Sequence, residues 1–141
     1  MNKKVINATS VSEDGIEFKS KSEKRMYDLL KSSGLEFSYE PERFTVMEGF
    51  YPRPWYKDTG LQKKKQIAIT YKPDFIVWGS GRLYVIEVKG FEVEKYLMRR
   101  KLFLDYIQKN DLAIDFFEVH TVRGMKFCID RIKELEHEYT G

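Results

Sequence analysis

The chain has 141 residues, of which 42% are hydrophobic and 15% aromatic, a composition that favours one folded domain over a disordered chain. Its formal net charge is only +3, from 25 basic and 22 acidic residues, so overall charge is a weak indicator of nucleic-acid binding. The single cysteine, Cys128, excludes an internal disulfide and a cysteine-rich zinc site, and the lack of a signal-peptide pattern or a long apolar run predicts a soluble protein of the cytoplasm.

The first part of the chain predicts a flexible arm followed by a helix. Residues 1–19 show no clear periodicity and are expected to form this arm or a segment ordered by a partner, which leaves one domain over residues 20–141. The sequence SKSE that begins at Ser20 fits a capping box, and Gly34 is typical of a helix end. The helix is therefore predicted to run from Ser20 to about Ser32.

Two less regular stretches follow this helix. Residues 35–46 predict one strand with an irregular edge at Pro41. Prolines and glycines forbid a continuous element over residues 48–66, where aromatic rings alternate with a run of lysines. This stretch is either a solubilising loop or a loop that binds a nucleic-acid strand, and the lysines that would contact phosphate are Lys63, Lys64 and Lys65.

The segment over residues 71–90, YKPDFIVWGSGRLYVIEVKG, predicts a β-hairpin, because apolar stretches flank the permissive turn sequence GSG. The hairpin register places Asp74 opposite Ile86 or Glu87. Because side chains alternate between the faces of a strand, Glu87 and Lys89 are expected on the same face. Two carboxylates and an ammonium group should therefore meet at one end of the hairpin.

A cation would resolve the repulsion between these two carboxylates, since each resists leaving water. Carboxylate oxygens suit Mg²⁺ or Mn²⁺, which usually retain water molecules and also bind phosphate oxygens of a substrate. Lys89 would then orient or deprotonate a water molecule, or neutralise the phosphate under attack. The alternative is that Glu87 and Lys89 form an ordinary exposed ion pair.

Glu23 has two interpretations as well. It lies at the edge of the apolar stripe of the first helix. Its carboxylate could close the capping box, or the helix could pack on the hairpin and bring Glu23 to the metal as a further acid.

The remaining elements predict the fold class. Helical spacing of apolar residues indicates a helix from Glu92 to about Asn110, a strand over 114–122 and a last helix over 124–139. Cys128 is expected to be buried and His120 to be structural or at the surface. The order helix, strand, hairpin, helix, strand, helix predicts an α/β fold with a mixed sheet flanked by helices. Basic residues of the middle helix form either a solvated face or a contact with a nucleic-acid backbone, and they are Lys95, Arg99 and Arg100.

Pro73-Asp74 followed by Glu87-Val88-Lys89 resembles the PD-(D/E)XK pattern of restriction-endonuclease-like nucleases, whose core has the element order αβββαβ. The run KSKSEKRMYDLLKSSGLEFSYEPE, together with KPDFIV and YVIEVKG, is similar to the phage-type endonuclease I family of Holliday-junction resolvases. The similarity covers most of the chain, from about residue 19 to residue 121.

The resemblance implies a Mg²⁺-dependent endonuclease that hydrolyses phosphodiester bonds in branched DNA as a homodimer and leaves 5′-phosphate ends, in a bacterium or a phage-infected cell. It implies that Asp74 and Glu87 bind the metal and that Lys89 is the motif lysine. Glu23 matches the acid that the family carries on its first helix, and the main-chain carbonyl of Val88 is a further candidate ligand.

Two alternatives to a junction resolvase stay open. The same nuclease site could act on other DNA, as in nicking, restriction-like or transposase-associated endonucleases, or the chain could be a non-catalytic relative that binds DNA. The segment over residues 48–66 is longer than in the endonuclease I family, which intertwines its protomers through this region. The geometry of a dimer and the preference for junctions therefore do not follow from the resemblance.

Overall fold

A computed structural model describes residues 11–90 and 94–140 of the chain. Contacts between residues group the described part of the chain into two compact units. Unit 1 comprises residues 11–41, 73–90 and 113–140, and unit 2 comprises residues 42–72 and 94–112. The sequence predicts one domain over residues 20–141, whereas the structure groups the same residues into two units with interleaved segments. No helix within the described residues is long and apolar enough to cross a bilayer.

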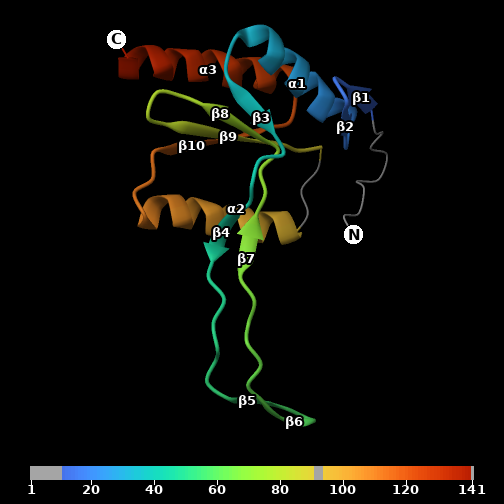
Figure 1. Ribbon diagram of the computed structural model, residues 1–141, viewed down its shortest axis with the longest axis vertical. Helices are drawn as coiled ribbons and strands as arrows, with labels where there is room; N and C mark the ends of the chain where they lie inside the picture. Colours follow the sequence, from blue (N-terminus) through green and yellow to red (C-terminus); the bar gives the residue numbers. More distant parts are fainter. Residues whose placement is uncertain (1–10, 91–93, 141) are drawn as a thin grey trace. The chain divides into compact units, whose positions relative to one another are not determined.

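Unit 1 is built on a mixed four-stranded sheet with the strand order β10-β9-β8-β3. The strands β3 and β8 pair antiparallel, as do β8 and β9, whereas β9 and β10 pair parallel. The helices α1 and α3 lie against the sheet (Figure 1), and the predicted α/β class with a mixed sheet flanked by helices is confirmed. The bounds of these elements are α1 Lys21–Ser33, β3 Phe37–Tyr39, β8 Phe75–Trp78, β9 Leu83–Val88, β10 Ile114–Val119 and α3 Val122–Thr140.

The core of unit 1 joins both helices to one face of this sheet. Cys128 on α3 is fully buried in it, as the sequence predicts, and burial raises the pKa of its thiol to about 12. The thiol is therefore protonated and packs as a small apolar group. The other members of the core are Met26, Leu30, Phe75, Val77, Tyr84, Ile86, Val88, Val119, Met125, Ile129 and Ile132.

The hairpin β8–β9 has the predicted register. Phe75 pairs with Ile86, so continuation of the antiparallel pairing places Asp74 opposite Glu87. Ile86 and Val88 belong to the core, and the alternation of side chains directs Glu87, which lies between them, to the other side. The predicted separation of acidic and apolar side chains along β9 is thus confirmed.

The helix α1 begins and ends as its sequence predicts. Ser20 is the N-cap, and its hydroxyl oxygen accepts a hydrogen bond of 3.1 Å from the backbone amide of Glu23. Gly34 ends the helix with a φ of 82°, a backbone conformation that glycine adopts without steric cost. These two signals fix the position of Glu23 in the first turn of α1.

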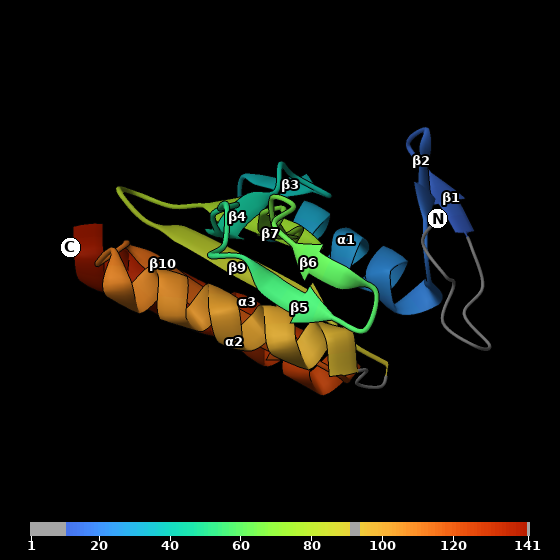
Figure 2. The same ribbon diagram turned by 90° about the horizontal axis from the view of Figure 1, so that it is seen from below.

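Unit 2 has its own core of aromatic side chains. In it, β4 and β7 pair antiparallel, and β5 and β6 form a separate hairpin (Figure 2). Phe103 of α2 is fully buried and packs between Phe44 of β4 and Tyr71 of β7, with ring-centroid distances of 5.0 and 4.8 Å. The bounds are β4 Phe44–Met47, β5 Trp55–Lys57, β6 Gly60–Gln62, β7 Ile69–Tyr71 and α2 Glu94–Lys109.

Several sequence-based boundaries are wrong. Residues 11–18 are not a flexible arm, because β1 (Val11–Glu13) and β2 (Ile16–Phe18) form a hairpin and Phe18 is fully buried; residues 1–10 of the predicted arm lie outside the described part. The single strand predicted over residues 35–46 is divided into β3 and β4, which belong to different sheets. The chain turns between them at Glu40, which has a φ of 49° and precedes a proline.

Some residues predicted to face the core in the last two helices are exposed in the structure. Helical spacing of the apolar residues in the sequence places Leu104 and Phe127 among the core-facing residues of these helices, but both are exposed. Phe103, next to Leu104, is buried in α2 and Met125 is buried in α3, because helical spacing alone does not decide which of two nearby apolar residues faces inward. The helix α3 begins at Val122, two residues before the predicted start at Gly124.

Removal of the α1 N-cap should destabilise the protein. Because the Ser20 hydroxyl satisfies one of the free amides of the first turn, we expect Ser20→Ala to lower the free energy of unfolding by about 1 kcal/mol. Urea denaturation measures this loss. Ser32→Ala is the matched control, since the exposed Ser32 hydroxyl bonds only to carbonyls of its own helix. Equal losses in the two variants would contradict the role of the cap.

Candidate functional site

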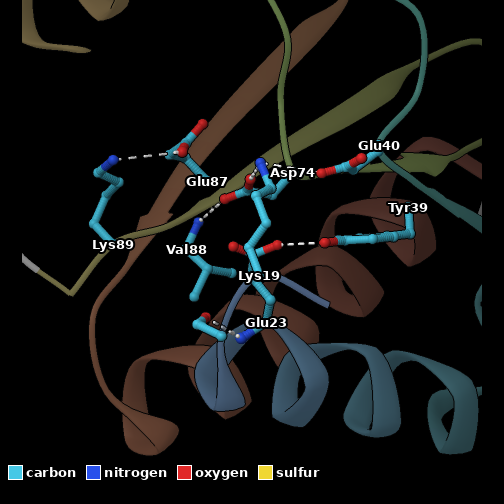
Figure 3. Close-up of polar contacts among 9 residues, drawn as sticks. Lys19, Glu23, Tyr39, Glu40, Asp74, Glu87, Val88 and Lys89 are labelled. Carbon is cyan, nitrogen blue, oxygen red and sulfur yellow. Dashed lines mark hydrogen bonds and ion pairs between the residues drawn. The ribbon is translucent and has the colours of Figure 1, made fainter. Parts of the chain in front are cut away.

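Three carboxylates are buried in unit 1, and they are the three acids that the sequence singles out. Glu23 on α1, Asp74 immediately before β8 and Glu87 on β9 are only 7%, 5% and 6% exposed. Charge repulsion couples Asp74 to both of the others. Figure 3 shows these side chains together with their polar partners. A buried acid is costly in the absence of a positive partner, so three in one place require compensation.

Asp74 is fixed from two sides by the backbone. Its Oδ2 accepts a hydrogen bond of 2.8 Å from the amide of Val88, and its carbonyl oxygen accepts one of 2.8 Å from the amide of Glu40. Burial, and then the charge of Glu87, raise the pKa of Asp74 well above its ordinary value. The Val88 amide therefore positions a carboxylate that strongly resists ionisation, while a ligand role for the Val88 carbonyl stays a prediction.

Lys19 supplies positive charge to this cluster. Its Nζ lies 3.0 Å from Oε1 of Glu40 and 3.9 Å from Oδ1 of Asp74 (Figure 3). Burial lowers the pKa of Lys19, but the attraction of Asp74, Glu23 and Glu40 outweighs it, so the pKa is raised. Sequence reasoning missed Lys19 and Glu40, because Lys19 falls in the supposed flexible arm and Glu40 in the supposed continuous strand.

The backbone amide of Glu23 bonds to the N-cap Ser20, whereas its side chain belongs to the acid cluster. Its Oε1 accepts a hydrogen bond of 2.5 Å from the hydroxyl of Tyr39. Burial and the charge of Asp74 raise the pKa of Glu23 to about 7, although Tyr39 and Lys19 lower it. This position favours the interpretation in which α1 brings Glu23 to the hairpin acids.

Lys89 lies beside Glu87, but the two do not form an ordinary surface pair. Lys89 Nζ is 3.9 Å from Glu87 Oε2, and the two side chains are only 16% and 8% exposed. The amide of Lys89 donates a hydrogen bond of 2.9 Å to the carbonyl of Val119 and so continues the β9–β10 pairing by one residue. The sheet thus holds the lysine next to a buried acid.

The donor set fits a hard cation that takes part of its shell from water and substrate. No group of three or more His, Cys, Asp or Glu side chains forms a ready metal cage among the residues that the structure describes. Mg²⁺ rarely uses such cages, since it binds through one or two carboxylates and keeps several waters. Asp74 and Glu87 supply two carboxylates whose mutual repulsion a cation would relieve.

The predicted DNA-contacting residues all belong to unit 2, whereas the acids belong to unit 1. Lys63, Lys64, Lys65 and Lys95 are exposed. Arg99 is half-buried and donates a hydrogen bond of 3.0 Å from Nε to the Thr70 carbonyl, which ties α2 to β7. Arg99 therefore has a structural contact in addition to any role with DNA. The guanidinium of Arg100 lies 5.7 Å from the centre of the Tyr96 ring.

Comparison with known proteins gives a family but no activity. A family model described as "Protein of unknown function (DUF1064)" matches residues 3–128, which is most of the chain. No match to a curated protein is found.

Neutralising Glu23 should stabilise the metal-free protein at alkaline pH. The folded-state pKa of about 7 exceeds the ordinary value of 4.5, so folding binds a proton and this group costs stability as pH rises from about 4.5 to 7. We expect Glu23→Gln to gain about 1–3 kcal/mol at pH 8 in EDTA and to lose this gain toward pH 4. Urea denaturation at both pH values measures it.

The exposed Glu138 on α3 provides a matched control. Glu138→Gln removes a carboxylate that is not buried, so its stability should follow that of the wild type at both pH values. A gain from Glu23→Gln that is the same at pH 4 and pH 8 would mean that the benefit does not come from removing a buried charge.

Proposed function

The chain belongs to the DUF1064 family, and we propose that it is a metal-dependent endodeoxyribonuclease that hydrolyses phosphodiester bonds in branched DNA. One observation carries this proposal. Unit 1 buries Asp74 and Glu87 of the PD-(D/E)XK pattern together with Glu23 and places Lys89 of the pattern beside Glu87, and burial followed by charge repulsion raises the pKa of Asp74 and Glu23.

The cost of this arrangement supports a catalytic role over a purely binding one. Burial and mutual repulsion oppose the ionised form of Asp74, and a protein that only bound DNA would gain nothing from such acids. Strongly perturbed acids with a specific charge partner are typical of catalytic sites. The acids also carry the wrong sign for contact with phosphate unless a cation stands between them and the substrate.

We assign metal binding to Asp74 and Glu87, with Glu23 and the Val88 carbonyl as additional candidate ligands. When bound there, Mg²⁺ supplies Lewis-acid stabilisation of the phosphate and makes a bound water more acidic. The Val88 amide holds Oδ2 of Asp74 in place, so this carboxylate presents a fixed orientation to the cation.

The remaining groups act on water and phosphate. Hydrolysis forms a bond between a water oxygen and phosphorus and breaks the bond to O3′, which leaves a 5′-phosphate and a 3′-hydroxyl. Lys89 contributes positive charge that stabilises the charge building up on the phosphate oxygens, or it orients the attacking water. Glu23 orients that water through its carboxylate or completes the ligand set.

The choice of branched DNA rests on the resemblance to Holliday-junction resolvases. Resolution of a four-way junction requires two cuts, and the proposed site occurs once in each chain. We therefore propose that the protein acts as a homodimer, which light scattering measures directly.

Cleavage of a labelled four-way junction beside a matched linear duplex tests this function. We expect cutting of the junction in Mg²⁺ and none in EDTA. Asp74→Asn should lower the rate by about 10²–10³-fold or more, because it weakens the metal site, and Lys89→Met by about 10²-fold. Asp130→Asn is the control, since Asp130 is an exposed acid on α3, and it should cut at the wild-type rate.

The outcomes separate the alternatives. Metal-dependent cutting of junction and duplex at equal rates would retain the site but assign it to a general endonuclease. Full activity of Asp74→Asn or Lys89→Met would refute the assignment of the site. A lack of cutting on every substrate, together with a lack of Mg²⁺ binding by calorimetry, would instead favour a relative that only binds DNA.

A further inference from the structure

The part of unit 2 between β4 and β7 is an extended two-stranded ribbon, and we use the name extended ribbon for residues 47–67. Its strands run side by side from β4 and β7 to the β5–β6 hairpin (Figure 1). Phe50 pairs with Gln66 midway along it through two backbone hydrogen bonds of 2.7 and 2.9 Å. At Gly49 a side chain would come within 2.9 Å of the Gln66 carbonyl oxygen, so this close approach of the strands requires glycine.

The extended ribbon concentrates exposed hydrophobic side chains. Among the described residues, seven of the twelve large hydrophobic side chains classed as exposed belong to it, and Tyr51 and Tyr56 are 76% and 77% exposed. A two-stranded hairpin has little core of its own to bury such residues. Exposed apolar side chains clustered in this way mark an interaction surface. The seven are Met47, Phe50, Tyr51, Trp55, Tyr56, Leu61 and Ile67.

The charge of the extended ribbon indicates the nature of its partner. It carries five basic residues against two acidic ones, Glu48 and Asp58. The basic residues are Arg53, Lys57, Lys63, Lys64 and Lys65, and all five are exposed. Pairing of two such ribbons from two copies of the chain would bring like charges together, which disfavours a second copy as the partner. A polyanion is the complementary occupant.

Two lysine side chains of the extended ribbon each lie close to an aromatic ring. Lys57 Nζ lies 5.7 Å from the centre of the Trp55 ring, and Lys65 Nζ lies 5.6 Å from the centre of the Tyr51 ring. A nucleotide offers the same two features at similar spacing, since it joins a flat base to a charged phosphate. Aromatic rings that stack on bases, flanked by basic side chains that follow the backbone, are the features that bind unpaired strands. Bases within a duplex already stack on each other and leave no free face for a ring.

We propose that the extended ribbon is a binding site for single-stranded DNA, in which the rings of Tyr51, Trp55 and Tyr56 stack on bases and the lysines contact phosphates. The proposal goes beyond the proposed function, because it adds a binding site on unit 2 for an unpaired DNA strand. It concerns a surface of unit 2 alone and does not depend on the acids of unit 1.

The test is binding of fluorescein-labelled oligo(dT) to the full chain in EDTA. An oligonucleotide of about 15 nucleotides is long enough to cover a typical single-strand binding site. We expect Tyr56→Ala and Tyr51→Ala each to weaken oligo(dT) binding about 5- to 100-fold, because each removes one stacking platform. Tyr56→Phe keeps the ring and should bind within about twofold of the wild type. Binding to a duplex of the same length should not change in any of these variants.

Two further variants separate stacking from apolar contact and from charge. Leu61→Ala removes an exposed apolar side chain opposite Tyr56 without removing a ring, so it should leave oligo(dT) binding unchanged. Replacement of Lys63, Lys64 and Lys65 together by glutamine should flatten the slope of log affinity against log salt by about 2, as expected for three lost phosphate contacts. Circular dichroism checks that each variant is folded.

The proposal is overturned if Tyr56→Ala and Tyr51→Ala bind oligo(dT) as tightly as the wild type, or if they weaken duplex binding equally. It is also overturned if Leu61→Ala weakens binding as much as Tyr56→Ala and dissociates an oligomer by light scattering, which would identify a protein interface. If oligo(dT) binding depends on the rings but the protein cuts no substrate, the proposed nuclease activity is refuted and the proposed single-strand binding site is retained. Metal-dependent cutting by the wild type, together with Tyr51→Ala and Tyr56→Ala variants that bind oligo(dT) as tightly as the wild type, would support the nuclease and refute the single-strand site.

Discussion

Repulsion among buried carboxylates is the constraint on which unit 1 depends. The hairpin register places Asp74 opposite Glu87, and α1 adds Glu23 near the same point, so the fold itself concentrates acidic groups away from water and thereby raises the pKa of Asp74 and Glu23. Hydrophobic packing of α1 and α3 against the sheet must outweigh this cost. The acid cluster therefore costs stability, and the hydrophobic core of unit 1 offsets this cost.

Lys19 supplies positive charge that offsets part of the repulsion within the acid cluster. It lies at the junction of β2 and α1, where the buried Phe18 and the cap Ser20 hold its backbone on both sides. Its ammonium group interacts with Asp74 and Glu40, and it partly offsets the charge that a cation would otherwise have to neutralise. If a divalent ion binds as proposed, it and Lys19 would both interact with Asp74.

Local patterns in the sequence predicted most of unit 1. The cap at Ser20, the stop at Gly34 and the alternation along β9 each depend on residues within a few positions of one another, and the structure confirms all three. The division of residues 35–46 into strands of different sheets depends instead on long-range pairing, which periodicity does not report. Lys19 was missed for the same reason, because only the tertiary structure brings it to Asp74.

The interleaving of the two units has a consequence for biosynthesis. The sheet of unit 1 is completed by β10, which pairs parallel to β9 only after the α2 segment of unit 2 has been made. Several core residues of unit 1 then come from α3, which follows β10 in the sequence. A nascent chain that stops at residue 112 would hold the acids on a sheet with an open edge and no α3 to cover it. Neither unit corresponds to a continuous stretch of the sequence, so β10 and α3 must be made before the sheet and the core of unit 1 can be completed.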